Sequence, residues 1–68
     1  MNLIQVSGLY NSHPIKTKYF KNQEKAIKYL DKVLTNLNVE IEEVFNQEDT
    51  LTTFVVNNYT RFMVTKLS

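Results

Sequence analysis

One segment near the middle of the sequence repeats its apolar residues with the period of an α-helix, and it separates two β-rich parts of the chain. Asn22 can cap the start of this segment, and Asn36 or Asn38 can end it in the left-handed conformation. No Gly or Pro interrupts it, so the pattern predicts a helix over residues 23 to 36. The apolar residues, which recur at steps of three and four, are Ala26, Ile27, Leu30, Val33, Leu34 and Leu37.

The part of the chain before this helix alternates apolar and polar side chains in two places. Residues 3 to 7 and 15 to 20 show this alternation, and together they predict a β-hairpin. The connection between them is long and contains Gly8 and a polar run. Because Pro cannot donate a ladder hydrogen bond, we place Pro14 at the start of the second strand.

After the helix, the spacing of apolar residues changes from the helical period to the strand period. An irregularity is expected at the acidic pair Glu42 and Glu43, and the polar residues 46 to 50 predict a turn. Asn57 and Asn58 predict a hairpin turn because Asn tolerates a positive φ. The expected strands cover residues 39 to 45, 51 to 56 and 59 to 67.

The length of this last turn decides which side chains face the core. A two-residue loop would mix polar and apolar residues on both faces of the hairpin. A three-residue loop, with Asn58 left-handed, would align Phe54 and Val56 with Phe62 and Val64 on one face. We favour the three-residue loop because one-sided burial specifies the register. The other face would then carry Leu51, Val55, Arg61 and Met63.

These elements predict an α+β fold in one domain over residues 1 to 68: an antiparallel β-sheet of four to five strands with one α-helix packed across one face, in the order ββαβββ. The chain is 43% hydrophobic but has no cysteine to staple it. A chain of this length buries only about 60% of its unfolded surface, so its stability must come from apolar packing.

One helix can cover only one face of a sheet, and this leaves a candidate interface on the other face. Phe45, Phe54 and Phe62 are expected in the core. An apolar patch left uncovered is unusual for a monomer and predicts a homodimer or a protein partner, the alternative being a patchy surface that binds nothing. The candidate protein interface consists of Leu51, Val55, Tyr59 and Met63.

The net charge is only +1, yet charge is segregated along the chain. Residues 13 to 36 carry +4 and residues 37 to 60 carry −5. At about 100° per residue, four lysines form one stripe opposite the apolar face of the helix. We call Lys21, Lys25, Lys28 and Lys32 the lysine stripe. They are either a solvated face or, with Tyr19 or Tyr29 to stack bases, a nucleic-acid contact. The candidate phosphate contacts are Lys16, Lys18, Lys21, Lys25, Lys28 and Lys32.

The acidic stretch is expected to be solvated, and its charges deter aggregation at a strand edge. Its alternative role is a contact surface for a basic partner. It does not have the ligand spacing of a calcium loop. The acidic residues are Glu40, Glu42, Glu43, Glu48 and Asp49.

The sequence contains almost none of the residues that catalysis commonly uses. It has one histidine, His13, together with one Gly and no cysteine, and a nucleophilic site needs a base and an orienting group. We therefore predict no enzyme activity, no cofactor or metal site and no small-molecule substrate. No apolar run, such as Phe54 to Val56, is longer than three residues, and the first residues do not resemble a signal peptide, so we expect a cytoplasmic protein without a membrane partner.

Seven Lys against one Arg, together with many Asn, indicate an AT-rich genome. The small cysteine-free format is similar to that of accessory proteins of bacteriophages and plasmids. We therefore expect a non-enzymatic binding protein from a phage or mobile element, for example an inhibitor of a host enzyme or defence system. The alternative is a nucleic-acid-binding accessory that uses the lysine stripe.

Overall fold

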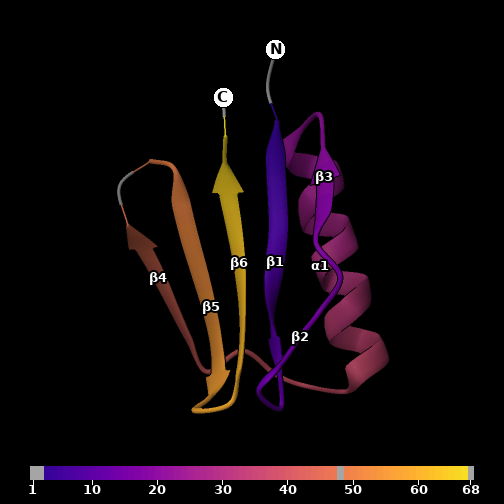
Figure 1. The fold of residues 1–68 in the computed structure, drawn as a ribbon, viewed down its shortest axis with the longest axis vertical. Helices are drawn as coiled ribbons and strands as arrows, with labels where there is room; N and C mark the ends of the chain where they lie inside the picture. Colours follow the sequence, from indigo (N-terminus) through magenta and orange to yellow (C-terminus); the bar gives the residue numbers. More distant parts are fainter. Residues whose placement is uncertain (1–2, 48, 68) are drawn as a thin grey trace.

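A computed structural model describes residues 3–47 and 49–67 of the chain. In these residues one helix packs with a six-stranded antiparallel sheet, which confirms the predicted α+β fold and order (Figure 1). The strand order is β2-β1-β6-β5-β4, and β3 also pairs with β1. The elements are β1 (Ile4–Tyr10), β2 (His13–Pro14), β3 (Lys18–Phe20), α1 (Gln23–Leu37), β4 (Glu43–Gln47), β5 (Leu51–Asn57) and β6 (Thr60–Lys66).

The strand count is higher than expected because one edge of the sheet is interrupted. β2 and β3 both pair with β1 and are separated by residues 15 to 17. The predicted long connection is wrong: β1 continues to Tyr10, and Asn11 and Ser12 form a tight turn with φ of 50° and 68°. Two successive positive φ values match the twist of a hairpin, so the chain reverses there without a loop. Pro14 lies in the short β2, opposite Leu9.

The helix has the predicted ends, extended by one residue. The Oδ1 atom of Asn22 accepts a hydrogen bond from the backbone N–H of Lys25 at 2.9 Å. This bond satisfies one of the free N–H groups of the first turn. Asn38 ends the helix with a left-handed φ of 56°, and its N–H donates to the carbonyl of Thr35 at 3.2 Å.

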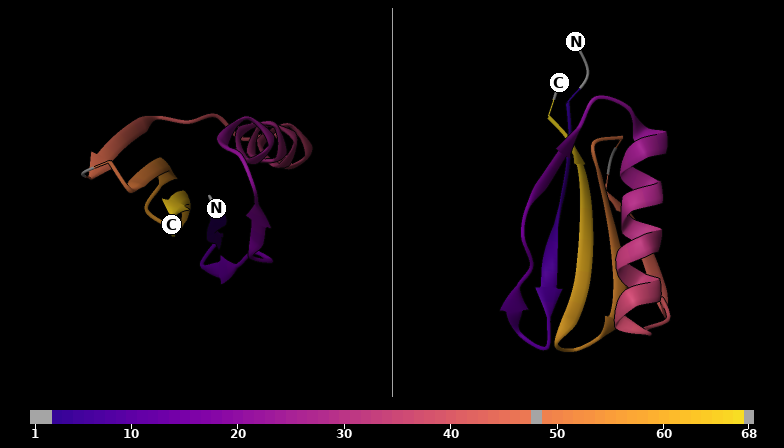
Figure 2. Two further views of the ribbon diagram at one scale, coloured as in Figure 1. Left: turned by 90° about the horizontal axis from the view of Figure 1, so that it is seen from above. Right: turned by 90° about the vertical axis from the view of Figure 1, so that its right-hand side faces the viewer.

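The core lies between α1 and the middle of the sheet (Figure 2). Strands β1 and β6 approach closely there because β1 carries Gly8 opposite Phe62. A Cβ atom at Gly8 would lie 2.9 Å from the Cα of Phe62 and would also meet the carbonyl oxygen of Arg61. Glycine is therefore required for this contact. The buried apolar residues are Ile4, Val6, Ala26, Leu30, Phe62 and Val64.

The β5–β6 hairpin has the favoured register but a different turn. Phe54 lies opposite Phe62, and both Phe54 and Val56 pack against the core as predicted. The left-handed Asn58 is wrong, because in the described residues positive φ occurs only at Asn11, Ser12 and Asn38. The extra residue is instead taken up by a register shift between Val55 and Asn57, and the Oδ1 atom of Asn57 accepts a hydrogen bond from the N–H of Tyr59.

Strand β4 begins four residues later than expected. The predicted strand over 39 to 45 is wrong at its start because Val39 and Ile41 pack against the core while the chain crosses from the helix to the far sheet edge. At the acidic pair, the N–H of Glu42 donates to the carbonyl of Val55, while Glu43 is the ladder partner of Val55. β4 itself pairs with β5 in one continuous register from Glu43 to Gln47, so the irregularity expected within the strand is not found there. The predicted turn is shorter than 46 to 50, and its Glu48 lies outside the described residues.

Candidate functional site

The helix packs on one face of the sheet and leaves the other face uncovered. Figure 1 looks onto the uncovered face, and the right-hand view of Figure 2 shows α1 on the opposite side. Side chains alternate between the two faces along each strand. Because Phe54 and Phe62 pack in or against the core, their neighbours in sequence lie on the uncovered face.

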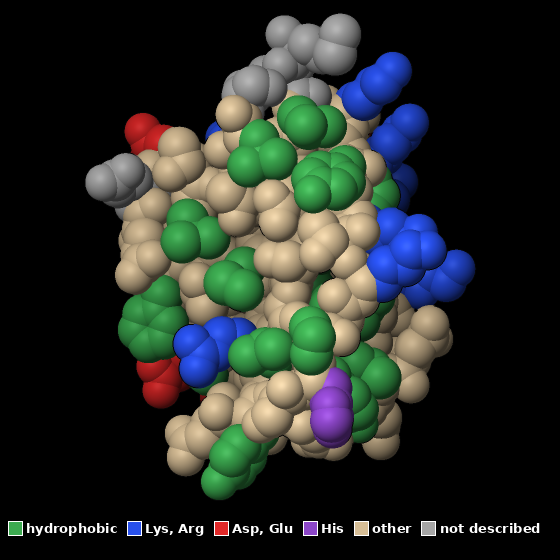
Figure 3. All heavy atoms as spheres, viewed as in Figure 1, with side chains coloured by type: hydrophobic (Ala, Val, Ile, Leu, Met, Phe, Trp, Pro, Cys, Tyr) green, Lys and Arg blue, Asp and Glu red, His purple; other side chains and the backbone are tan. Residues whose placement is uncertain are grey.

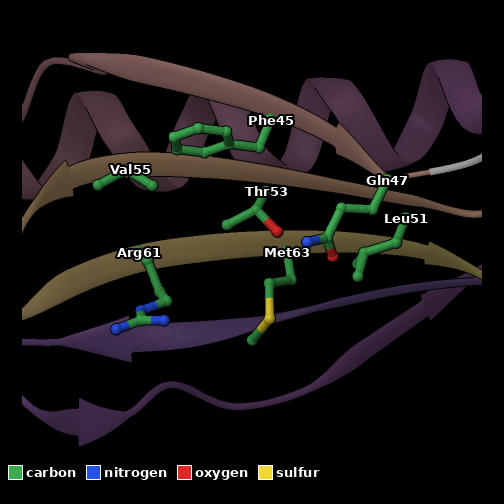
Figure 4. Close-up of a pocket in the computed structure, with 7 residues that line it drawn as sticks. All are labelled: Phe45, Gln47, Leu51, Thr53, Val55, Arg61 and Met63. Carbon is green, nitrogen blue, oxygen red and sulfur yellow. The ribbon is translucent and has the colours of Figure 1, made fainter.

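A groove of about 420 Å³ crosses this uncovered face (Figure 4). Its middle is a row of paired residues across three strands, in which Phe45 lies opposite Thr53 and Thr53 lies opposite Met63. The small threonine between two large side chains leaves the hollow. We call this groove, with its seven lining residues, the open-face groove; they are Phe45, Gln47, Leu51, Thr53, Val55, Arg61 and Met63.

Three of the four predicted interface residues come together in the open-face groove. Leu51, Val55 and Met63 line it and are half-buried. Tyr59 does not line it: it lies in the turn before β6 and is 64% exposed. The register of the hairpin therefore places the strand residues correctly, whereas the position of a turn side chain does not follow from strand alternation.

Phe45 is the main apolar residue of the groove that sequence analysis placed elsewhere. The prediction that it belongs to the core is wrong, since its side chain is 48% exposed. The reason is the sheet order: β4 is the outermost strand, and Phe45 points to the face without a helix. In the sheet Phe45 pairs with Thr53 and not with a core residue, a register that residues 43 to 47 alone do not encode.

Charge lies at the margins of the uncovered face. Figure 3 shows hydrophobic side chains across its middle, acidic groups on the left margin, and basic groups mostly on the right margin but also on the left. Arg61 is the charged residue that lines the open-face groove. In the described part of the chain, Lys28 and Glu24 form the one ion pair, so Arg61 has no ion-pair partner there.

A second, smaller apolar groove of about 180 Å³ lies on the helix side of the sheet. Sequence analysis missed it because one helix was expected to cover the whole face. The helix contacts β1 and β3, which lie toward one edge, and the far half of the sheet is left without a helix above it. We call this the helix-side groove; its lining residues are Ile27, Leu30, Asp31, Leu34, Ile41 and Phe54.

The candidate phosphate contacts lie away from both grooves. The helix lysines Lys25, Lys28 and Lys32 are exposed, as are Lys21 before the helix and Lys16 before β3, and Lys18 is half-buried. The Nζ atom of Lys28 lies 3.5 Å from Oε1 of Glu24, and both side chains are largely exposed. Such a surface pair is worth well under about 1 kcal/mol.

The two tyrosines proposed to stack bases differ in their surroundings. Tyr29 packs against Phe20, with ring centroids 5.3 Å apart, and is half-buried. The prediction that Tyr29 is free to stack a base is therefore wrong. Tyr19 on β3 is 57% exposed and does not have this restriction.

No metal-binding group of three His, Cys, Asp or Glu side chains is found among the residues that the structure describes. His13, in β2, is exposed. Across residues 3–47 and 49–67, no helix is both long and apolar enough to cross a membrane. Comparisons with known protein families, with curated proteins and with solved structures find no match to this chain.

Proposed function

We propose that this chain is a small non-enzymatic binding protein that acts by contact with another protein, and that the open-face groove is the centre of the contact. The observation that carries the proposal is the row of Phe45, Thr53 and Met63 across three strands on a face without a helix. Apolar side chains gathered on an uncovered face are typical of protein–protein interaction sites.

The groove has the properties of an interface centre. Its side chains project from paired strands, so little conformational entropy is lost when a partner binds. Phe45, Met63 and Arg61 belong to the residue types that are enriched at interfaces. A standard interface needs only about 800 Å² on each partner, which is within reach of one face of a 68-residue chain.

The proposed class is an inhibitor or regulator from a phage or other mobile element, acting in the cytoplasm on a host enzyme or defence system. Its support is the small cysteine-free format and the excess of Lys over Arg and of Asn that AT-rich genomes favour. An acidic DNA mimic does not fit, because the net charge is +1.

The test is Met63→Lys, which places a charge in the middle of the groove. Tagged wild-type and variant proteins are used to capture proteins from an extract of the native host, and sedimentation measures self-association. We expect the amount of partner captured by Met63→Lys to fall at least about tenfold, while the circular dichroism spectrum and the melting transition of the variant remain those of a folded protein.

Asn36→Lys, on the exposed side of the helix, is the matched control because it adds the same charge outside the groove. Val55→Lys is the second groove variant. If both groove variants retain the partner as well as Asn36→Lys does, the groove is only surface and the proposal is wrong.

The lysine stripe supports a second candidate, a nucleic-acid-binding accessory. Lys25, Lys28 and Lys32 on α1 and Lys21 just before it are exposed, where phosphates could reach them. The segregated charge favours this reading, whereas the net charge of +1 does not.

A further inference from the structure

We propose that the edge strand β4 binds an extended, basic segment of the partner protein as an additional strand of the sheet. This inference rests on the proposed function and states the form and charge of what is bound. β4 is the last strand in the sheet order and pairs only with β5. All five of its residues are exposed. An edge strand of this kind presents unpaired N–H and C=O groups that an extended peptide can use.

The two edges of the sheet differ in how well they are protected. The opposite edge is interrupted between β2 and β3, contains Pro14 and carries Lys16 and Lys18. Interruptions, prolines and lysines are the usual means by which proteins prevent pairing at an edge. β4 has no interruption, proline or lysine; its one charged residue is Glu43 at its start, and it places Val44 and Phe45 at its centre. Of the two edges, only that of β4 is therefore open to an added strand.

Apolar side chains of β4 are exposed on both faces of the sheet. Phe45 lines the open-face groove. Val44 points to the other face, is 52% exposed, and pairs with Phe54, which lines the helix-side groove. Successive side chains of an added strand point to alternate faces. Such a strand would therefore place apolar side chains beside Phe45 on one face and beside Val44 on the other.

The charge near β4 selects a basic segment. Glu42 and Glu43 lie at the start of the strand, and Asp49 follows its end. In the described residues none of these carboxylates forms an ion pair. A second copy that paired through its own β4 would bring the same acidic groups together, which is unfavourable. Lysines or arginines at the ends of a bound segment would instead face opposite charges.

The probe is a fluorescent peptide of about nine residues, the length of a long strand, with two lysines at each end, threonines next to them, and Val-Ile-Val at the centre. Its sequence reads the same in both directions, so it suits either strand orientation. One control peptide replaces every lysine with glutamate. Two further control peptides each carry N-methyl groups on every second amide. The methylated positions in one peptide are shifted by one residue relative to the other, so that one of the two peptides has its β4-facing edge blocked.

Binding is measured by fluorescence anisotropy at low and moderate salt, and amide hydrogen exchange is measured along the intact chain. We expect the lysine peptide to bind at least about tenfold more tightly than the glutamate peptide at low salt, with a smaller difference at higher salt. Exchange of β4 amides should slow when it binds. One of the two N-methylated peptides should lose this binding because it cannot form ladder hydrogen bonds.

Glu43→Lys tests the charge at β4, and Glu24→Lys is its matched control with the same charge change on the exposed helix. We expect Glu43→Lys to lose the preference for the lysine peptide and Glu24→Lys to keep it. Equal binding of both N-methylated peptides and the parent, or no slowing of exchange in β4, overturns strand addition. A dimer of the free chain with protected β4 amides also overturns it, because the occupant is then a second copy.

The two proposals fail in different ways. If Met63→Lys loses the captured partner while the peptide leaves β4 exchange unchanged, the open-face groove binds protein and strand addition is wrong. If Met63→Lys and Val55→Lys both retain the partner, the groove proposal is wrong whatever the peptide does. Strand addition is supported only when the peptide protects β4 and Glu43→Lys also weakens partner capture.

Discussion

The backbone N–H of Asn11 donates a hydrogen bond of 3.1 Å to the Oγ1 atom of Thr60, a residue 49 positions away in the sequence. A second bond runs between the same segments, from the N–H of Ser12 to the carbonyl of Tyr59 at 2.8 Å. Together they join the β1–β2 turn to the β5–β6 hairpin at one end of the sheet (Figure 1). Thr60 is only 1% exposed, so its hydroxyl cannot exchange this partner freely for water.

Thr60→Val should therefore destabilise the protein by about 1–3 kcal/mol, because the part-buried N–H of Asn11 loses its acceptor while the side-chain volume is nearly kept. Thr60→Ser is the control, since it retains the hydroxyl and loses one methyl group. Urea denaturation gives the free energy of unfolding of both variants. Equal losses in Val and Ser variants would show that packing, and not the hydrogen bond, is what matters at Thr60.

Leu30→Ala should lower the free energy of unfolding by about 2–5 kcal/mol, because Leu30 is buried between the helix and the sheet. Ile27→Ala, on the same helix but 40% exposed, should cost less than half as much. Both are measured by thermal and denaturant unfolding. A loss below about 0.5 kcal/mol at Leu30 would contradict the core described above.

Gly8→Ala should destabilise by about 1–3 kcal/mol, since the added Cβ meets the backbone of β6, which cannot rotate away as a side chain could. Ser7→Ala is the matched change on the same strand, with its side chain on the opposite face, and should stay within about 0.5 kcal/mol of the wild type. If Gly8→Ala and Ser7→Ala have the same free energy of unfolding, β1 and β6 can move apart at Gly8 without a loss of stability.

Asn38→Gly should keep or slightly raise stability, and Asn38→Ala should lower it by about 1 kcal/mol. The reason is the left-handed φ of 56° at the helix end, which Gly adopts freely and Ala does not. The midpoint of urea unfolding reports both changes. Asn36→Ala, inside the helix, is the control, because Ala is a better helix former than Asn there. A stabilising Asn38→Ala is the result that contradicts this account.

The lysine stripe should bind DNA or RNA weakly or not at all at about 0.15 M salt. If four lysines did contact phosphates, affinity would fall about 50-fold or more between about 50 and 200 mM salt. Lys25→Glu combined with Lys28→Glu would then abolish binding, while the fold should persist because both side chains are exposed. Submicromolar, salt-sensitive binding lost in this double variant would favour the nucleic-acid candidate over the proposed function.

The elements that could be predicted from the sequence are those fixed by local pattern. The helix followed from apolar spacing and from Asn22 and Asn38 at its ends, which are interactions within a few residues. The register of Phe54 with Phe62 followed from the need to bury one face. Three of the four interface residues could be placed for the same reason.

The features that could not be predicted depend on contacts between distant segments. Ser12 has a positive φ that is unusual for serine, and the bonds of this turn to Tyr59 and Thr60 accompany it. The exposure of Phe45 depends on β4 being outermost, and nothing within residues 43 to 47 encodes the sheet order. The helix-side groove likewise depends on where α1 lies across the sheet.

The two neighbouring strands that form the centre of the sheet are the first and the last along the chain. β1 pairs with β6 from Ile4 opposite Lys66 to Leu9 opposite Arg61. These contacts close almost the whole chain into one loop. The conformational entropy of loop closure is lost before core packing gives any stabilisation, so proteins of this topology fold slowly. During synthesis, β1 and the apolar side of α1 stay without their main partner until β6 has left the ribosome. The nascent chain therefore completes its core only after β6 has been synthesised, and until then its apolar residues are available to chaperones and proteases.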